Sequence, residues 1–320
     1  MEPEVFFNVQ QGPYWDWRVA MDLFLGGAGV GAFLFGIALD EVFKGRYRRI
    51  CQTAAYLAPF LILVGLGFLL LKLGRPLHLP LSYVTFAPKS PLWWGGIFQP
   101  LLVIGAILYA LKWHKAQEQP AAQDPARRRL GLALVPLAVI VGTYHGLLLE
   151  VMTARPLWNT GPTVVAAILG FATTGIAAVM LTHLLRMKLA GRLADEEHVR
   201  IFLDDMIWTR HVLVSTLVLQ LATLFFWWLS LNYGALQDKQ ALAAANEAFG
   251  TTFWRMGIGV GLVLPLILGA YAVWREKTPD QGLQLAVIGL TSAFILVGGY
   301  YFRLAVVLAG QVELPISSLS

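Results

Sequence analysis

Long, nearly continuous apolar segments dominate this sequence, and short polar connections separate them. A helix that spans a bilayer needs about 20 predominantly apolar residues. Eight segments meet this requirement, at roughly Val19–Leu39, Cys51–Leu73, Leu92–Leu111, Leu130–Met152, Pro162–Leu185, Ile207–Leu231, Phe253–Trp274 and Leu283–Leu308. Barrel strands would be about 10 residues long with strict alternation. The pattern therefore predicts an all-α integral membrane protein with eight transmembrane helices in a single domain over residues 1–320.

The segment between the second and third spans is apolar but rich in proline. Leu73–Pro91 carries Pro76, Pro80, Pro88 and Pro91, and proline interrupts helices because it lacks a backbone N–H. We interpret this segment as a structured loop at the membrane surface.

The composition supports a membrane protein and excludes several soluble classes. Hydrophobic residues make up 57% of the sequence and charged residues only 13%, whereas soluble domains have about 25% charged residues. The net charge of +5 does not indicate nucleic acid, because the basic residues lie at the ends of apolar segments. With Cys51 as its one cysteine, this protein alone cannot form a disulfide or a thiolate-ligated metal centre. Met1–Gly12 lacks the basic and apolar parts of a signal peptide.

The distribution of Lys and Arg predicts the orientation. The connections after spans one, three, five and seven hold 15 of the 24 Lys and Arg residues. Cytoplasmic loops carry the excess of positive charge, so these connections are expected in the cytoplasm. Both termini are then expected on the periplasmic side of a bacterial or archaeal plasma membrane.

The outward connections are rich in Trp, Tyr and Pro. Pro13–Trp17, Ser90–Gly95 and Arg155–Asn159 all have this composition. Aromatic residues gather at membrane interfaces, which explains many of them. They are also favoured, together with arginine, in the cores of protein interfaces. The second interpretation predicts a docking surface that includes Trp93, Trp94, Arg155 and Trp158.

Ionisable residues at membrane depth are costly and are therefore functional candidates. Asp22 lies about one turn into the first span. It could pair with an arginine such as Arg18 or Arg303, or it could be a buried carboxyl that exchanges a proton. The sequence leaves both open.

A polar stripe marks the outer half of the fourth span. Tyr144 and His145 are adjacent, and Glu150 follows six residues after Tyr144. Such a stripe suits a site that binds a carbonyl group and moves protons, although packing alone explains many membrane tyrosines. Arg303, near the outer end of the last span, is expected to snorkel to the interface, as are Arg210 and Arg255.

Two alternatives concern cofactors. His183 and His211 lie near the cytoplasmic ends of adjacent spans, so a pair of haem ligands is geometrically feasible.

The glycine run Gly26–Gly31 lacks the preceding strand and the spacing of a dinucleotide loop, and small residues in an apolar helix favour close packing. The sequence contains no phosphate-binding loop, nucleophile triad or metal-ligand spacing, so redox chemistry would require a bound small molecule and a partner.

Four motifs spread along nearly the whole sequence carry a resemblance to a known family. They are Trp15-Asp16-Trp17, Phe86–Gly95, Tyr144–Leu149 followed by Ala154–Asn159, and Phe302–Gly310. Together they resemble the NrfD/PsrC family, the membrane subunits of polysulfide-reductase-like and nitrite-reductase-like complexes. The resemblance implies two packed four-helix bundles, here 1–152 and 153–320.

The resemblance also implies a function. Such subunits bind menaquinone or ubiquinone near the periplasmic face, without haem or metal. They exchange electrons with an external iron–sulfur (ferredoxin-like) subunit, which connects to a molybdopterin or cytochrome catalytic subunit. The family's quinone ligands correspond to Tyr144 and a polar residue of the first span. Here that residue is Asp22, where polysulfide reductase has a histidine.

We therefore expect a quinone-reactive membrane subunit of a respiratory oxidoreductase, which does not act on the terminal substrate alone. Tyr144 and Asp22 are the expected quinone ligands, and His145, Glu150 and Arg303 are candidate proton relays. A proton-conducting or transport subunit and a haem b-bearing anchor are the alternatives. The terminal substrate, the direction of electron flow and the identity of the quinone are left open by the sequence.

Overall fold

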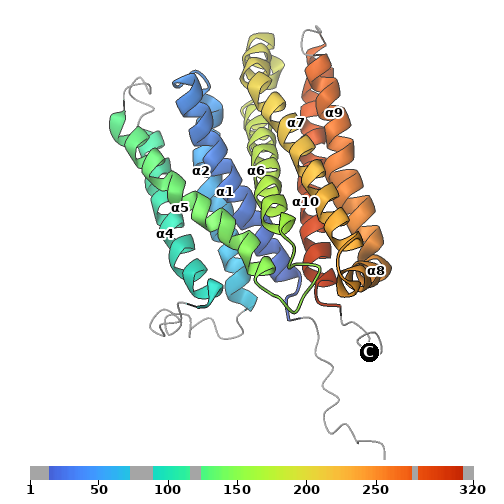
Figure 1. Ribbon diagram of the computed structural model, residues 1–320. Coiled ribbons are helices and arrows are strands. Elements are labelled where there is room, and N and C mark those ends of the chain that lie inside the picture. Colours follow the sequence, from blue (N-terminus) through green and yellow to red (C-terminus); the bar gives the residue numbers. More distant parts are fainter. Residues whose placement is uncertain (1–13, 73–88, 116–123, 276–279, 313–320) are drawn as a thin grey trace, which may run out of the picture.

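The computed structural model describes residues 14–72, 89–115, 124–275 and 280–312. Within these ranges the protein forms helices and no strand (Figure 1). The helices are α1 (Trp17–Phe43), α2 (Arg48–Lys72), α4 (Pro91–Lys115), α5 (Pro125–Glu150), α6 (Pro162–Leu189), a 3₁₀ turn η4 (Arg192–Ala194), α7 (Glu196–Asn232), α8 (Leu236–Gly250), η5 (Thr251–Val263), α9 (Leu264–Trp274) and α10 (Gln281–Ala309). Eight helical segments among the described residues are long and apolar enough to cross a membrane. The all-α fold with eight spans is therefore confirmed.

Side-chain caps fix where several helices begin. The Asp16 carboxylate accepts a hydrogen bond from the backbone N–H of Arg18 at the start of α1, and Asp124 and Asp195 cap α5 and α7 in the same way. These bonds satisfy N–H groups that have no partner inside the helix. Partial burial raises the pKa of Asp16, but this backbone bond and the neighbouring Lys72 bring it below its ordinary value.

The helices pack as two groups of four. Helices α1, α2, α4 and α5 contact one another, and α6, α7, α10 and the η5–α9 segment form the second group. The groups join mainly where α1 lies against α6, with further contacts between α5 and α6 and between α1 and α10. The boundary expected after Met152 falls in the connection between α5 and α6, and as a domain boundary it stays a prediction.

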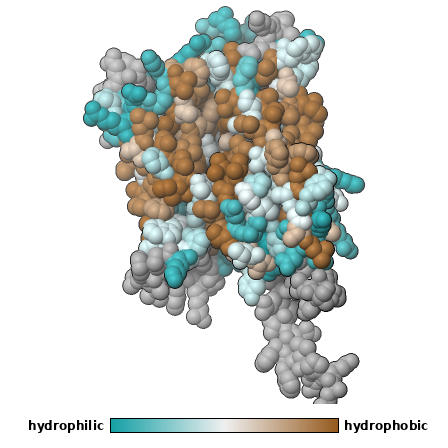
Figure 2. Space-filling view, viewed as in Figure 1, coloured by the Kyte–Doolittle hydropathy of each residue, from teal (hydrophilic) through white to brown (hydrophobic). Residues whose placement is uncertain are grey.

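Both ends of the described helical part lie at the same end of the molecule (Figure 1). Helices α1, α4 and α6 begin there, and α2, α5, α7 and α10 end there. We call this end the predicted outer face, because its membrane side follows only from the distribution of Lys and Arg. Figure 2 shows hydrophobic residues over the middle of the visible surface and hydrophilic residues toward its ends, as a bilayer requires.

The seventh span differs from the sequence expectation. The expected span Phe253–Trp274 is preceded by the additional helix α8, and its first half, η5, is wound as a π-helix. Pro265 has no N–H to donate to the carbonyl of Gly261 one turn earlier, which is compatible with the wider winding. The apolar pattern cannot reveal this winding, because it records composition rather than hydrogen bonding. The expected loop at Leu73–Pro91 lies mostly outside the described residues.

Candidate functional site

The glycines of α1 let neighbouring helices approach very closely. A Cβ added at Gly31 would lie 2.0 Å from the backbone oxygen of Phe171 on α6, and one at Gly29 would lie 2.8 Å from the backbone oxygen of Ala58 on α2. Such distances are shorter than van der Waals contact, so only glycine fits. The packing interpretation of the glycine run is therefore confirmed, and α1 is held at the centre of the molecule.

Gly26 has a different environment, because three polar side chains meet beside it. A Cβ at Gly26 would lie 3.2 Å from His145 Nε2, 3.6 Å from Asp22 Oδ1 and 3.6 Å from Gln99 Nε2. These groups belong to α5, α1 and α4, and each residue is at most 2% exposed. The missing side chain leaves a small gap that buried groups of three helices share. We call Asp22, Gln99 and His145 the acid–base cluster.

Asp22 is held by an amide and not by a cation. The Gln99 amide donates to Asp22 Oδ1 at 3.5 Å. Arg18 lies instead 4.0 Å from Asp16, and within the described ranges no basic side chain lies within 4 Å of Asp22. The ion pair with Arg18 or Arg303 that the sequence left open is therefore not formed. Among the described residues, Asp22 therefore has a hydrogen-bond donor but no counter-charge.

The hydrogen bond of His145 fixes which ring nitrogen is basic. His145 Nδ1 lies 2.7 Å from the carbonyl oxygen of Val141, and a carbonyl can only accept, so Nδ1 carries the hydrogen. The neutral ring then presents the lone pair of Nε2. That atom is buried and has no hydrogen-bond partner among the described residues. An unsatisfied buried acceptor beside a carboxyl makes His145 a candidate for ligand binding or proton transfer.

Tyr144 is fixed against a glycine of α4. A Cβ at Gly95 would lie 1.9 Å from Cζ and 2.2 Å from the hydroxyl oxygen of Tyr144, so the phenol lies directly on the α4 backbone. Its ring contacts that of His145 with centroids 5.4 Å apart. The structure therefore brings Tyr144 beside the acid–base cluster, as the sequence predicted.

Gln99 was not identified from the sequence. It is an uncharged amide, so a search for ionisable residues passes over it. The available signal was that Leu92–Leu111 contains no other amide or charged residue, and a lone amide in a membrane helix usually needs a hydrogen-bond partner.

Glu150 does not join this cluster in the described structure. It is the last residue of α5 and is half-buried. Its backbone carbonyl accepts a hydrogen bond from the Asn159 amide, and no described contact links its carboxylate to Tyr144 or His145. Its proposed part in a proton relay is untested.

Arg303 belongs to a second polar cluster, in the other group of helices. The guanidinium donates to the carbonyl of Gly299 at 2.9 Å and to the Thr174 hydroxyl at 3.4 Å. It lies over the rings of Phe24 and Phe171, 5.6 and 5.1 Å from their centroids. Thr173, the neighbour of Thr174 in the sequence, donates to Gln220 Oε1 at 2.5 Å. We call Arg303, Thr174, Thr173 and Gln220 the cationic cluster, after the charge of Arg303.

Two arginines expected to snorkel are buried instead. Arg303 is 7% exposed and Arg210 is 3% exposed, so the snorkelling prediction is wrong for both. Arg210 donates to Gln284 Oε1 at 3.2 Å on α10. Arg255 is exposed. Helix packing, which the sequence does not give, decides which face of a helix turns inward.

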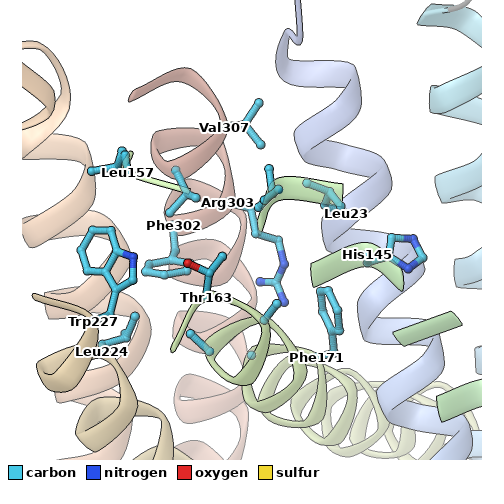
Figure 3. A pocket seen from close by; sticks show the side chains of 15 residues that line it. Leu23, His145, Leu157, Thr163, Phe171, Leu224, Trp227, Phe302, Arg303 and Val307 are labelled. Carbon is cyan, nitrogen blue, oxygen red and sulfur yellow. The ribbon is translucent and has the colours of Figure 1, made fainter. Parts of the chain in front are cut away.

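A cavity of about 50 Å³ lies between the two helix groups. Figure 3 shows Arg303 near its centre, with Phe171 between the arginine and His145. Leu157, Trp227 and Phe302 close its other side. His145 therefore contacts the cavity and also the gap at Gly26.

The aromatic residues of the predicted outer face are divided between buried and exposed positions. Trp158 is 2% exposed, is stacked on Trp15 with centroids 5.3 Å apart, and donates to the carbonyl of Val306 at 2.7 Å. It therefore holds the α5–α6 connection in place. Trp94 is 41% exposed, while Trp93 and Arg155 are half-buried. A docking role for this face stays a prediction.

The two histidines considered for haem have different surroundings. His183 Nδ1 lies 3.2 Å from the Thr53 hydroxyl, and its Nε2 lies 4.0 Å from Asp205. His211 Nδ1 lies 2.9 Å from the carbonyl oxygen of Ile207 in its own helix. No group of three or more metal-ligating side chains occurs among the described residues. The expectations about haem and metals stay predictions.

Fold and site together describe a multi-pass helical membrane protein with a buried acid–base cluster near one face. The family model described as polysulphide reductase, NrfD matches residues 6–315. The protein therefore belongs to the NrfD family, and the sequence resemblance is confirmed.

Three relatives match over most of their length. "Protein NrfD" of Escherichia coli is 23% identical, with 93% of the present sequence and 95% of the relative covered. "Protein NrfD homolog" of Haemophilus influenzae is 26% identical, with coverages of 93% and 94%. The C subunit of the polysulfide reductase of Wolinella succinogenes is 26% identical, also with 93% and 94% covered.

Proposed function

We propose that this protein is the quinone-reactive membrane subunit of a respiratory oxidoreductase complex in the bacterial or archaeal plasma membrane. The observation that carries the proposal is the convergence of Asp22, Gln99 and His145 on the gap beside Gly26. Membership of a family of reductase membrane subunits is consistent with it. The ligand class is menaquinone or ubiquinone.

The chemistry of the site fits a ring that carries two oxygens. Gln99 and the Tyr144 hydroxyl provide hydrogen-bond donors, and the buried Nε2 of His145 provides an acceptor. The Asp22 carboxyl can donate when protonated and accept when ionised. A quinol bound here gives up two electrons and two protons on oxidation.

The residues then have distinct roles. Tyr144 and Asp22 would hold the two ring oxygens, with Gln99 fixing the position of the carboxylate. His145 would receive protons at Nε2, because Val141 keeps the hydrogen on Nδ1. A base positioned in this way typically contributes about 10²–10⁴-fold to a proton-transfer rate.

Electrons must leave the protein, because no redox group of its own is expected. We propose that they pass to an iron–sulfur subunit docked at the predicted outer face, near Trp93, Trp94 and Arg155. That subunit would connect to a molybdopterin or cytochrome subunit that acts on the terminal substrate. The aromatic side chains at this face have the composition that interface cores favour.

The test uses the gently purified protein, the variant Tyr144→Phe and the control Tyr109→Phe. Tyr109 is also buried, at 3% exposed, but lies on α4 toward the opposite face. Quinone is extracted and measured by mass spectrometry, and quinol oxidation is measured in the assembled complex. We expect near-stoichiometric quinone in the wild type and the control, and at least tenfold less quinone or activity in Tyr144→Phe. Normal turnover by Tyr144→Phe would show that the site is elsewhere, and a haem absorbance band would overturn the cofactor assignment.

A further inference from the structure

His183 lies near the end of the molecule opposite the predicted outer face, at a place where the two helix groups meet. It is six residues from the end of α6, which is about 9 Å at 1.5 Å per residue. The residue is 4% exposed, and its ring stacks on Phe202 of α7 with centroids 5.3 Å apart. The Thr53 hydroxyl of α2 lies 3.2 Å from Nδ1. His183 therefore contacts a helix of each group.

The hydrogen bonds of Thr53 indicate which ring nitrogen of His183 carries the hydrogen. A hydroxyl has one hydrogen and two lone pairs. Thr53 donates to the carbonyl of Arg49 at 3.0 Å and accepts from Nη1 of Arg186 at 2.7 Å. Its remaining lone pair can only accept, so the hydrogen of the neutral ring is on Nδ1. The lone pair is then on Nε2, a buried atom with no hydrogen-bond partner among the described residues.

A second acceptor faces that nitrogen. Asp205 Oδ2 of α7 lies 4.0 Å from His183 Nε2, and the two side chains are 12% and 5% exposed. An ionised carboxylate can only accept hydrogen bonds, so it cannot bond to the lone pair of Nε2. One proton would make the carboxyl a donor and would allow the two atoms to approach to hydrogen-bonding distance. The buried pair is therefore one proton short of a hydrogen bond.

The surroundings favour the carboxyl over the ring as the holder of that proton. Arg186 donates to the same Thr53 oxygen that His183 Nδ1 approaches, so a guanidinium lies close to the ring. A second positive charge beside it costs free energy in a buried region, whereas a protonated Asp205 carries no charge. The charged and titratable groups around the pair are Arg46 and Tyr47 of the α1–α2 connection, Arg49 and Cys51 of α2, Arg186 of α6 and Asp204 of α7.

We propose that His183 and Asp205 form a proton-operated contact between α6 and α7. At acidic pH the Asp205 carboxyl donates to His183 Nε2. As the pH rises, the O–H bond breaks and water takes the proton, which leaves a carboxylate that repels the Nε2 lone pair. Because Thr53 connects the ring to α2, the loss of this contact loosens the junction of the two helix groups.

Protons from the aqueous phase can reach the pair. Asp204, the neighbour of Asp205, lies 3.5 Å from Arg46, and their side chains are 51% and 62% exposed. The pair thus lies just beneath a hydrated, charged rim. By the distribution of Lys and Arg, this rim is expected on the cytoplasmic side. The contact therefore responds to the pH of the compartment opposite the proposed quinone site.

Infrared difference spectroscopy tests where the proton is. A protonated carboxyl has a C=O stretching band that a carboxylate lacks. The spectra use Asp22→Asn as the parent, so that the other buried carboxyl without a counter-charge contributes nothing. We expect a C=O band that disappears as the pH is raised from about 4.5 to about 8.5. Adding Asp205→Asn should abolish this band, and adding the control Asp204→Asn, the same change at the next residue, should keep it.

Histidine ¹⁵N NMR tests the tautomer in protein with an intact Asp205. His183→Gln identifies the signals of His183. Over the same pH range the ring should keep one hydrogen, on Nδ1, while the signal of Nε2 shifts as its donor is lost. His198, whose side chain is 39% exposed beside Asp195, should gain a second hydrogen at acidic pH and is the internal reference.

The effect on the helix junction is measured as the midpoint of thermal unfolding in detergent. Across this pH range the midpoint of the wild type should fall by about 3 °C more than that of Asp205→Asn. The reason is that the amide of asparagine can donate to Nε2 at every pH. Asp204→Asn should follow the wild type.

Three results would each overturn the proposal. They are a C=O band that survives Asp205→Asn, a His183 ring that carries two hydrogens at acidic pH, and a midpoint of Asp205→Asn that falls as far as that of the wild type. If Asp205→Asn fails to fold, the NMR titration of the wild type decides. Quinone enters none of these measurements, so the proposed function and this contact can fail separately.

Discussion

The two buried polar clusters differ in kind, although each joins several helices and each contains a glutamine. The acid–base cluster holds a carboxyl and an imidazole, both able to gain and lose a proton. The cationic cluster holds Arg303, hydroxyls and an amide, none of which changes its charge near neutral pH. The acid–base cluster surrounds the gap at Gly26, and Arg303 of the cationic cluster lines the cavity beyond Phe171.

Because of this difference, we assign proton exchange to the acid–base cluster and an electrostatic effect to the cationic cluster. Protons can be exchanged only where the titratable groups are, so ligand chemistry belongs to the first group of helices. A lone buried arginine adds a constant field to that site without exchanging protons. His145 lines the cavity and also borders the gap at Gly26.

The largest expected effect concerns stability and contrasts Arg303 with a paired arginine. Arg127 forms a 2.7 Å ion pair with Asp40, and both are less than 9% exposed. Arg127→Met should lower the free energy of unfolding by about 3–5 kcal/mol, because it leaves a buried charge unpaired. Arg303→Met strands no acid and should change it by less than about 1 kcal/mol. Unfolding in mixed detergent micelles measures both.

The contrast has an internal control. In Asp40→Leu/Arg127→Met both charges are removed, so stability should return most of the way toward the wild type. A loss in Arg303→Met as large as that in Arg127→Met would mean that Arg303 is a structural residue, and the electrostatic role would lose its support.

The next effect concerns proton transfer within the acid–base cluster. Asp22→Asn keeps the shape of the side chain and a partner for Gln99 but removes the titratable group. Quinol oxidation should fall by about 100-fold or more. Thr174→Val in the cationic cluster should lower it less than threefold. Steady-state oxidation of a quinol analogue by the complex measures both, and near-normal activity of Asp22→Asn would mean that protons leave by another group.

A smaller effect is expected from filling the gap that defines the site. The methyl group of Gly26→Ala would lie within 3.6 Å of all three polar side chains. Quinone binding should weaken about tenfold, or about 1.4 kcal/mol. Gly67→Ala is the matched control, since a Cβ there meets no atom within 4 Å. Equal quinone affinities of Gly26→Ala and Gly67→Ala in binding titrations would show that the quinone does not occupy the gap.

The sequence predicted the spans well, because long apolar segments alone decide whether a helix crosses a membrane. It also singled out Tyr144, His145 and Asp22 as candidate site residues, since polar groups are rare at membrane depth. Their roles stay predictions. It could not show that Gln99 is the partner of Asp22. That contact joins residues 77 positions apart and depends on how α1 and α4 pack.

The expectations that failed depended on the rotation or winding of helices. Arg303 was expected at the interface, but α10 turns it inward between two phenylalanines. The π-helical winding of η5 and the inter-group cavity likewise arise from packing against other helices. Apolar composition around these positions is uniform, so hydropathy carries no signal for them.

The central claim is that quinone binds at the acid–base cluster, and photoaffinity labelling tests it most directly. A photoreactive quinone is bound to the wild-type complex, irradiated, and located by peptide mass spectrometry, with excess natural quinone as competitor. The account predicts competable labelling of peptides that contain Asp22, Gln99 or Tyr144 and His145. Competable labelling confined to the second group of helices, around Trp227 and Arg303, would contradict it.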